Sequence, residues 1–191
     1  MNEIKIISPV YNRVRIDGPV RLGELPLCGK INLRGDAGNK QFLAAVTSVL
    51  GIVPPIKPNT RHMGDTTTVF WLGPDEWLCH GGLPQTPTLV ADLRSRLAGI
   101  HSAVVEVSDY YTVLRLDGSG SADLLSRACP LDLHPSVFNK GACAQTRFGH
   151  ASILLHKISN APSFEIQVRW SFAEYVWDYL VSGMRALAVS D

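Results

Sequence analysis

Two short stretches, Ile31-Asn32-Leu33-Arg34-Gly35 and Leu114-Arg115-Leu116-Asp117-Gly118, follow one pattern of residue types. In each, apolar side chains alternate with polar ones and the run ends at a glycine, which is typical of a half-buried strand that enters a turn. A short helix and a proline-marked exit are expected after both. The recurrence predicts an internal duplication, with half-domains at residues 1–100 and 101–191 inside one compact unit.

The first half carries the signals of strands, helices and a hairpin. Residues 10–16 alternate apolar and polar side chains, which predicts a strand. Asp36 is placed to cap a helix that follows the second strand. Residues 66–72 are rich in β-branched and aromatic residues, and the turn Gly73-Pro74-Asp75 predicts that they fold back as a hairpin. Another helix is expected to begin near Pro87. The inner stripe of the helix after Asp36 is expected to be Phe42, Ala45, Val46, Val49 and Leu50.

The second half repeats this order. Ser171 and Glu174 can form a capping box at the start of the last helix. Together the halves predict an α+β protein built from two related β-α-β-β-α half-domains, with helices on one face of mainly antiparallel sheet. Strands are expected at 103–107, 111–117, 153–155 and 164–170, and a helix at 121–128.

Composition and charge exclude several classes of partner. Apolar residues make up 46% of the chain and charged residues only 18%, so a folded core is expected, with a surface suited to another protein. Eighteen basic and 17 acidic residues leave a net charge of +1 without a long run of one sign, which excludes a nucleic-acid partner. The longest uncharged stretch, residues 41–56, is too short to span a membrane, and the pattern of the first residues leads us to expect no secretory leader. We therefore expect a cytoplasmic protein.

The motifs of common catalytic and cofactor sites are missing. Gly118-Ser119-Gly120 lies between a strand and a helix, as in a dinucleotide fingerprint, but Asp123 stands where the third glycine belongs and would repel a pyrophosphate. The sequence has no phosphate-binding P-loop, no G-x-S-x-G and no H-E-x-x-H. Its four cysteines are far apart, which predicts reduced thiols without a metal site. No catalytic, cofactor-binding or metal-binding residues are expected.

Five stretches, taken in order, resemble the gamma subunit of the heterotetrameric sarcosine oxidases. The resemblance covers about residues 20–182 and is most specific in the run that begins at Cys129 and in the turn after Leu72. Asn139-Lys140 and Tyr110-Tyr111 depart from the family pattern. The stretches are Leu72-Gly73-Pro74-Asp75-Glu76-Trp77-Leu78, Val107-Ser108-Asp109, Leu114-Arg115-Leu116-Asp117-Gly118, Cys129-Pro130-Leu131-Asp132-Leu133-His134-Pro135 and Gly141-Ala142-Cys143-Ala144-Gln145-Thr146.

The resemblance implies a non-catalytic structural subunit of a four-chain oxidoreductase that oxidatively demethylates sarcosine to glycine. In that family the one-carbon unit passes to tetrahydrofolate or leaves as formaldehyde, and oxygen is reduced to hydrogen peroxide. The implied partners are the alpha, beta and delta subunits, which carry FAD, FMN, NAD and zinc, while this chain carries no cofactor. The implied fold is that of the folate-binding domain of glycine-cleavage T-proteins.

Two functions therefore remain open, and each has candidate residues. A structural subunit needs a partner surface, and the prolines of the Cys129–Pro135 loop would pre-order such a surface. Trp71 and Trp77, which flank the hairpin turn, pack in the core or join this surface. The alternative is a T-protein-like domain that itself binds a one-carbon carrier, with Arg115, Arg147 or Arg169 contacting the glutamate carboxylate of the folate. The expected interface consists of Cys129, Pro130, Leu131, Asp132, Leu133, His134, Pro135, Trp71 and Trp77.

Overall fold

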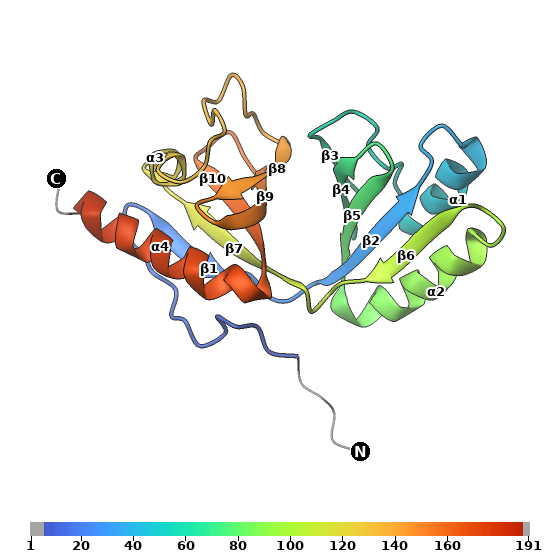
Figure 1. Ribbon diagram of the computed structural model, residues 1–191, viewed down its shortest axis with the longest axis horizontal. Coiled ribbons are helices and arrows are strands. Elements are labelled where there is room, and N and C mark those ends of the chain that lie inside the picture. The colour runs from blue at the N-terminus through green and yellow to red at the C-terminus, as the bar shows by residue number, and fades with distance from the viewer. Residues whose placement is uncertain (1–5, 189–191) are drawn as a thin grey trace, which may run out of the picture. The chain divides into compact units, whose positions relative to one another are not determined.

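The computed structural model describes residues 6–188, and the chain divides into two compact units (Figure 1). The β7 unit contains residues 6–27, 109–140 and 145–188, and the β2 unit contains residues 28–108 and 141–144. These bounds differ from the expected halves, 1–100 and 101–191. The reason is that the N-terminal strand β1 pairs with β7, a strand of the second half.

The β7 unit is a five-stranded sheet in the order β1-β7-β10-β9-β8, with two helices packed on one side (Figure 1). Strand β7 runs antiparallel to both β1 and β10, and β10 runs antiparallel to β9. The elements are β1 (Arg21–Glu24), β7 (Tyr111–Asp117), α3 (Ser121–Ser126), β8 (Cys143–Phe148), β9 (Ala151–Lys157), β10 (Ser163–Arg169) and α4 (Trp170–Ala188). The first two residues of β8 are grouped with the β2 unit.

The β2 unit is a second five-stranded sheet, in the order β3-β4-β5-β2-β6, and its helices α1 and α2 pack side by side. Strand β2 is antiparallel to β5 and β6, and β4 is antiparallel to β3 and β5. The elements are β2 (Gly29–Gly35), α1 (Lys40–Leu50), β3 (Arg61–Met63), β4 (Thr68–Gly73), β5 (Glu76–Gly81), a short 3-10 helix (Leu83–Gln85), α2 (Thr86–Arg96) and β6 (Ser102–Glu106).

The two sheets share one strand arrangement, which confirms the α+β class and the repeat. The order β6-β2-β5-β4-β3 in one unit corresponds to β1-β7-β10-β9-β8 in the other. In both units the chain runs from the second strand of this order through a helix, three strands and another helix. The edge strand differs in origin, because β6 follows α2 whereas β1 precedes the whole repeat. Each unit therefore has more strands than the β-α-β-β-α pattern predicts.

Three local predictions were wrong. Residues 10–16 form no strand, because apart from a single bridge between Ile16 and Leu22 they have no pairing neighbour. The cap of α1 is Asn39, whose Oδ1 accepts the N–H groups of Gln41 and Phe42. The side chain of Asp36 instead accepts the N–H of Gly38, which precedes the helix. Helix α4 begins directly after β10, so Ser171 lies inside the helix and does not cap it.

The core of the β2 unit lies between its sheet and its helices. Helix α1 buries Phe42, Val46 and Leu50 and partly buries Ala45 and Val49, so its predicted inner stripe is confirmed. These side chains pack with apolar residues of α2 and with one face of the sheet. The remaining buried members are Ile31, Leu33, Val69, Trp77, Cys79, Val90, Leu93, Leu97 and Val104.

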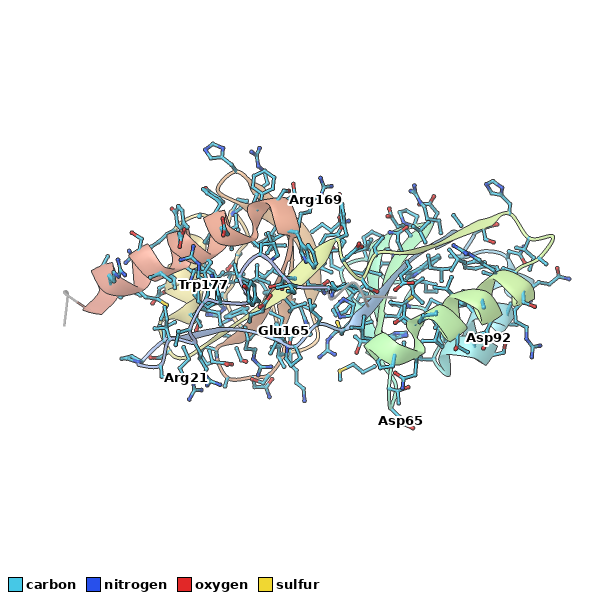
Figure 2. All side chains as sticks on the ribbon, turned by 90° about the horizontal axis from the view of Figure 1, so that it is seen from below. Arg21, Asp65, Asp92, Glu165, Arg169 and Trp177 are labelled. Atoms are coloured by element: carbon cyan, nitrogen blue, oxygen red, sulfur yellow. The ribbon has the colours of Figure 1, made fainter. Side chains whose placement is uncertain are left out.

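The β7 unit has a core of its own. Leu114 and Leu116 on β7 and Phe164 and Ile166 on β10 are completely buried, and their positions alternate with polar residues along each strand. Helix α4 adds Val176, Trp177 and Leu180 (Figure 2). Burial of such side chains contributes about 1.5–3 kcal/mol each, so each unit has its own apolar stabilisation.

Candidate functional site

The Cys129–Pro135 loop is anchored from inside the β7 unit. Cys129 and Leu133 are only 4% and 6% exposed, and Phe138 beyond the loop is also buried. The N–H of Cys129 donates to the carbonyl of Leu125 at the end of α3. Asp132 Oδ1 accepts the N–H of His134 at 2.9 Å, which closes a tight turn. The loop is therefore a fixed surface feature.

Because Cys129 and Leu133 fix the loop to the core, only some of the expected interface residues are exposed. Pro130, Asp132, His134 and Pro135 are exposed, and Leu131 is half-buried. Cys129 and Leu133 support them from below. The loop thus presents alternating apolar and polar groups on a backbone that prolines restrict, and little conformational entropy would be lost on docking.

The two tryptophans play different roles, and both lie in the β2 unit. Trp77 has no exposed surface, and its ring lies 5.6 Å from that of Phe42 between centroids. Its Nε1 donates to the carbonyl of Pro55 at 2.7 Å. Trp77 is therefore a core residue and offers no surface to a partner. Trp71, directly opposite it on β4, is half-buried, so it can both pack against the core and contact a partner.

A chain of polar contacts crosses the sheet of the β7 unit. Arg115 donates through Nε to Asp117 at 3.1 Å and through Nη1 to Glu165 at 3.3 Å. Glu165, on β10 and labelled in Figure 2, also approaches His156, whose Nδ1 is 3.3 Å from its other oxygen. Ser163 donates a hydrogen bond to Asp117. The residues are brought together because β7, β10 and β9 place them in neighbouring register.

This arrangement lowers the pKa of Asp117 below its ordinary value of 3.8. Burial acts in the opposite direction and raises it. The hydrogen bonds from Ser163 and Arg115 and the positive charges of Arg115 and Arg21 outweigh burial. The carboxylate is thus held ionised as a structural acceptor.

Asp117 should make the protein less stable in acid. A depressed pKa in the folded state contributes stability that is present above the unfolded value of 3.8 and is lost as the pH falls below it. We expect the free energy of unfolding, measured by urea titration at about pH 7 and about pH 3, to fall less for Asp117→Asn than for the wild type. Asp92→Asn, an exposed change on α2, should keep the wild-type slope. Identical slopes for all three proteins would contradict this role of Asp117.

The three arginines considered for folate binding lie on different strands and differ in their surroundings. Arg115 is already paired with two carboxylates. Arg169 is exposed, and its guanidinium carbon lies 5.3 Å from the centroid of the Tyr110 ring (Figure 2). Arg147 is exposed on β8. A carboxylate ligand would have to compete with Asp117 and Glu165 for Arg115, so Arg115 is poorly suited to bind one.

The cysteines and the acidic residues form no metal centre within residues 6–188, where no group of three or more His, Cys, Asp or Glu side chains could hold an ion. All four cysteines are free thiols. Burial raises the pKa of Cys79 to about 12 and that of Cys143 to about 11, so both resist ionisation. Within the same described range, no helix combines the length and apolar character needed to cross a membrane.

Sequence reasoning missed one feature, a groove beside β1. Its walls come from Ile6, Ile7 and Tyr11 and from Leu25, Pro26 and Leu27, with Ser8 and Glu24 between them. The sequence does contain two short apolar runs, Ile6-Ile7 and Leu25-Pro26-Leu27, that could have indicated the groove walls. The two runs lie on the same groove only because of the path that the N-terminal segment takes, and short-range periodicity does not predict this path.

The structure is an α+β protein in which one arrangement of sheet and helices occurs twice. The fold resembles that of the glycine cleavage system aminomethyltransferase T from Bartonella henselae, with a TM-score of 0.64 at 15% identity over 84% of this chain and 45% of that one. At this identity the likeness concerns the fold alone.

A family model described as sarcosine oxidase, gamma subunit family, matches residues 34–185. The chain belongs to the sarcosine oxidase gamma subunit family, which confirms the resemblance drawn from its motifs. It is 29% identical to a sarcosine oxidase subunit gamma from Corynebacterium sp. (strain P-1), over 90% of this chain and 83% of the relative. It also matches a chain of the heterotetrameric sarcosine oxidase from Corynebacterium sp. U-96, in complex with pyrrole 2-carboxylate, with a TM-score of 0.85 at 28% identity over 94% and 95% of the two chains.

Proposed function

We propose that this chain is the non-catalytic structural subunit of a heterotetrameric sarcosine oxidase. The observation that carries the proposal is the family match over residues 34–185, and the match in fold to a chain of such a complex supports it. Most of the buried side chains are apolar and belong to the core. Between residues 6 and 188, no group of side chains could hold a metal ion. Such a chain would supply shape and contact area to an oxidoreductase whose chemistry resides elsewhere.

In this proposal the partners are the alpha, beta and delta subunits, and FAD, FMN, NAD and zinc are bound by them. The complex would demethylate sarcosine to glycine in the cytoplasm, transfer the one-carbon unit to tetrahydrofolate or release it as formaldehyde, and reduce oxygen to hydrogen peroxide. An obligate complex of this kind needs a large interface, typically 2,000 Å² or more in total. The low content of charged residues, 18%, is compatible with such an interface.

Co-expression of all four subunits with a tag on this chain tests the proposal. The tagged chain should co-purify with flavin-bearing partners and with sarcosine oxidase activity. Purified alone, it should be colourless and inactive toward sarcosine. Failure to retain the partners, or turnover of sarcosine by the isolated chain, would overturn the proposal.

The alternative, a domain that itself binds a one-carbon carrier, is favoured by the likeness to a T-protein fold. The pairing of Arg115 with Asp117 and Glu165 argues against it. Calorimetric titration of the isolated chain with tetrahydrofolate distinguishes the two functions. Heat of binding at micromolar ligand would establish the alternative, and a flat titration supports the structural subunit.

We also propose that the Cys129–Pro135 loop contacts a partner subunit. Leu131→Asp places a charge at its half-buried apolar position and should reduce the amount of partner that co-purifies by about tenfold, which corresponds to about 1.4 kcal/mol. Val53→Asp, an exposed change in the β2 unit, is the control and should have no effect. Leu133→Asp is unsuitable because Leu133 is buried and the change would destabilise the fold. Normal assembly of a folded Leu131→Asp chain would remove the loop from the interface.

A further inference from the structure

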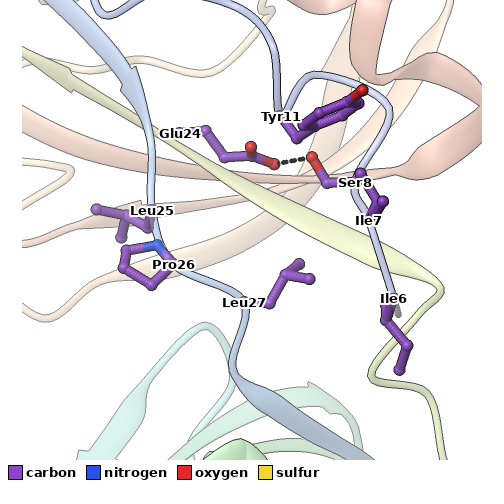
Figure 3. A pocket seen from close by; sticks show the side chains of 8 residues that line it. All are labelled: Ile6, Ile7, Ser8, Tyr11, Glu24, Leu25, Pro26 and Leu27. Carbon is purple, nitrogen blue, oxygen red and sulfur yellow. Dashed lines mark hydrogen bonds between the residues drawn. The ribbon is translucent and has the colours of Figure 1, made fainter. Parts of the chain in front are cut away.

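The groove beside β1 is an apolar cavity with a single charged side chain. Its volume is about 390 Å³, within the range of sites that accept a ligand or a partner's side chains. Leu25, Pro26 and Leu27 line one side, and Ile6 and Ile7 line the other (Figure 3). All of its lining residues precede residue 34, where the family match begins, so the argument rests on the geometry of this chain.

The charge in the groove is the carboxylate of Glu24, and two buried hydroxyl groups hold it in place. Ser8 and Thr112 both donate hydrogen bonds to Oε1 of Glu24 (Figure 3 shows the bond from Ser8). Ser8 is 3% exposed and Thr112 is fully buried, so neither hydroxyl moves freely. A carboxylate held in this way is positioned to accept another donor without further ordering.

Among residues 6–188, no basic side chain lines the groove around Glu24. The described residues that line the groove include no lysine, arginine or histidine. The hydroxyl groups satisfy one carboxylate oxygen but do not neutralise the negative charge. A cationic group that entered the groove would meet this charge against apolar walls, where water screens it less than at an open surface.

The walls of the groove expose apolar surface. Ile6 and Ile7 are each 43% exposed, and Tyr11 is 66% exposed. Exposed apolar side chains that gather around a concave surface are typical of an interaction site, whereas single ones are common on any protein. Tyrosine is also enriched among the residues that dominate interface energies.

We propose that this groove is the docking site for a segment of another subunit of the complex, a segment that carries one lysine or arginine between apolar side chains. The basic group pairs with Glu24, and the apolar neighbours cover Ile6, Ile7 and Tyr11. This inference rests on the proposed function, because it requires that the chain be part of an assembly. The half-buried carboxylate of Glu24 determines the charge of the segment that binds, and the apolar walls determine that the residues beside the basic group are apolar.

Charge substitutions at Ile7 test both features in the co-expressed four-subunit complex. Ile7→Lys adds repulsion toward a basic segment and removes apolar contact, and we expect about a tenfold loss of co-purified partner. Ile7→Asp removes the same contact but adds an attractive charge, so its loss should be smaller. Val14→Lys and Val14→Asp, at an 83% exposed position of the same segment outside the groove, are the matched controls and should assemble normally.

The role of Glu24 is tested separately with Glu24→Gln. The amide oxygen can still accept the hydrogen bonds of Ser8 and Thr112, so the fold is kept while the charge is lost. We expect partner retention to fall several-fold and to become less dependent on salt concentration than in the wild type. Asp92→Asn removes one negative charge from exposed α2 and should change neither property. Unchanged melting temperatures would show that the loss is not one of folding.

The outcomes separate this inference from the proposed function. If the wild-type chain assembles and the Ile7 and Glu24 variants assemble equally well, the groove is not a docking site, while the subunit function stands. A greater loss with Ile7→Asp than with Ile7→Lys would contradict a basic occupant. Groove-dependent dimerisation of the isolated chain, measured by sedimentation, would assign the groove to a second copy and overturn the proposal. If the wild-type chain retains no partner, both proposals fall.

Discussion

Replacement of Trp77 by alanine should lower the free energy of unfolding by about 4 kcal/mol, within the range for large aromatic residues lost from a core. The side chain has no exposed surface and packs against Phe42 of α1, so its removal leaves a cavity between sheet and helix. The indole N–H also satisfies the carbonyl of buried Pro55, which would lose its partner. Two contributions, packing and hydrogen bonding, therefore act in the same direction.

A short series of variants separates the two contributions in urea denaturation. Trp77→Phe retains much of the ring contact but removes the hydrogen bond to Pro55, and a loss of about 1–2 kcal/mol is expected. Trp71 is half-buried on the neighbouring strand β4, so Trp71→Ala should lower the free energy of unfolding clearly less than Trp77→Ala. Equal losses for Trp71→Ala and Trp77→Ala would show that the different burial of the two rings has no energetic consequence.

The hairpin that carries these tryptophans shows what sequence patterns can predict. Gly73-Pro74-Asp75 is a local turn signal, and β4 and β5 meet there as expected. Residues 10–16 have an equally regular alternation, but they pair only through the single bridge between Ile16 and Leu22, so they do not form a strand. Strand pairing depends on partners that are distant in the sequence. Strands β1 and β7, for example, pair although they are about ninety residues apart, and local periodicity cannot predict such a pair.

The same limit applies to the candidate interface. Leu131 and Leu133 are chemically identical and two positions apart, yet one is half-exposed and the other is buried. The sequence therefore identified the loop through its prolines and its family pattern but could not identify which side chains it presents. Glu24 was missed for a related reason: its two hydroxyl partners come from residues 8 and 112, which only the folded chain brings together.

A large loss of stability is also expected from substitution of Gly118, the glycine that directly follows β7 in the second of the two matching stretches. Its φ is +118°, and a Cβ atom there would lie 2.0 Å from the carbonyl oxygen of Pro19. Backbone atoms cannot give way as a flexible side chain can, and the left-handed conformation is unfavourable for alanine. Overpacking and backbone strain add up to an expected loss of about 4 kcal/mol for Gly118→Ala.

The matching glycine of the other unit is constrained differently. A Cβ atom at Gly35 would lie 2.2 Å from a ring carbon of buried Phe42, but Gly35 has no left-handed φ. The ring can shift slightly, so Gly35→Ala should cost about 1–3 kcal/mol. Gly51 has a φ of +69° with nothing within 4 Å of the added atom, so alanine meets only backbone strain and should cost about 1 kcal/mol.

Urea denaturation of the three alanine variants orders these effects as Gly118, Gly35 and Gly51, from largest to smallest. This order tests why a glycine occurs at the matching positions 35 and 118 of the two units. Both matching stretches close with a glycine, Gly35 at the end of β2 and Gly118 directly after β7. At each glycine a neighbouring atom lies too close for a side chain, but that atom belongs to the backbone of Pro19 in one unit and to the packed ring of Phe42 in the other. A smaller loss for Gly118→Ala than for Gly51→Ala would mean that close approach to Pro19 is not the constraint. The repeated glycine would then have to be explained by the turn conformation alone.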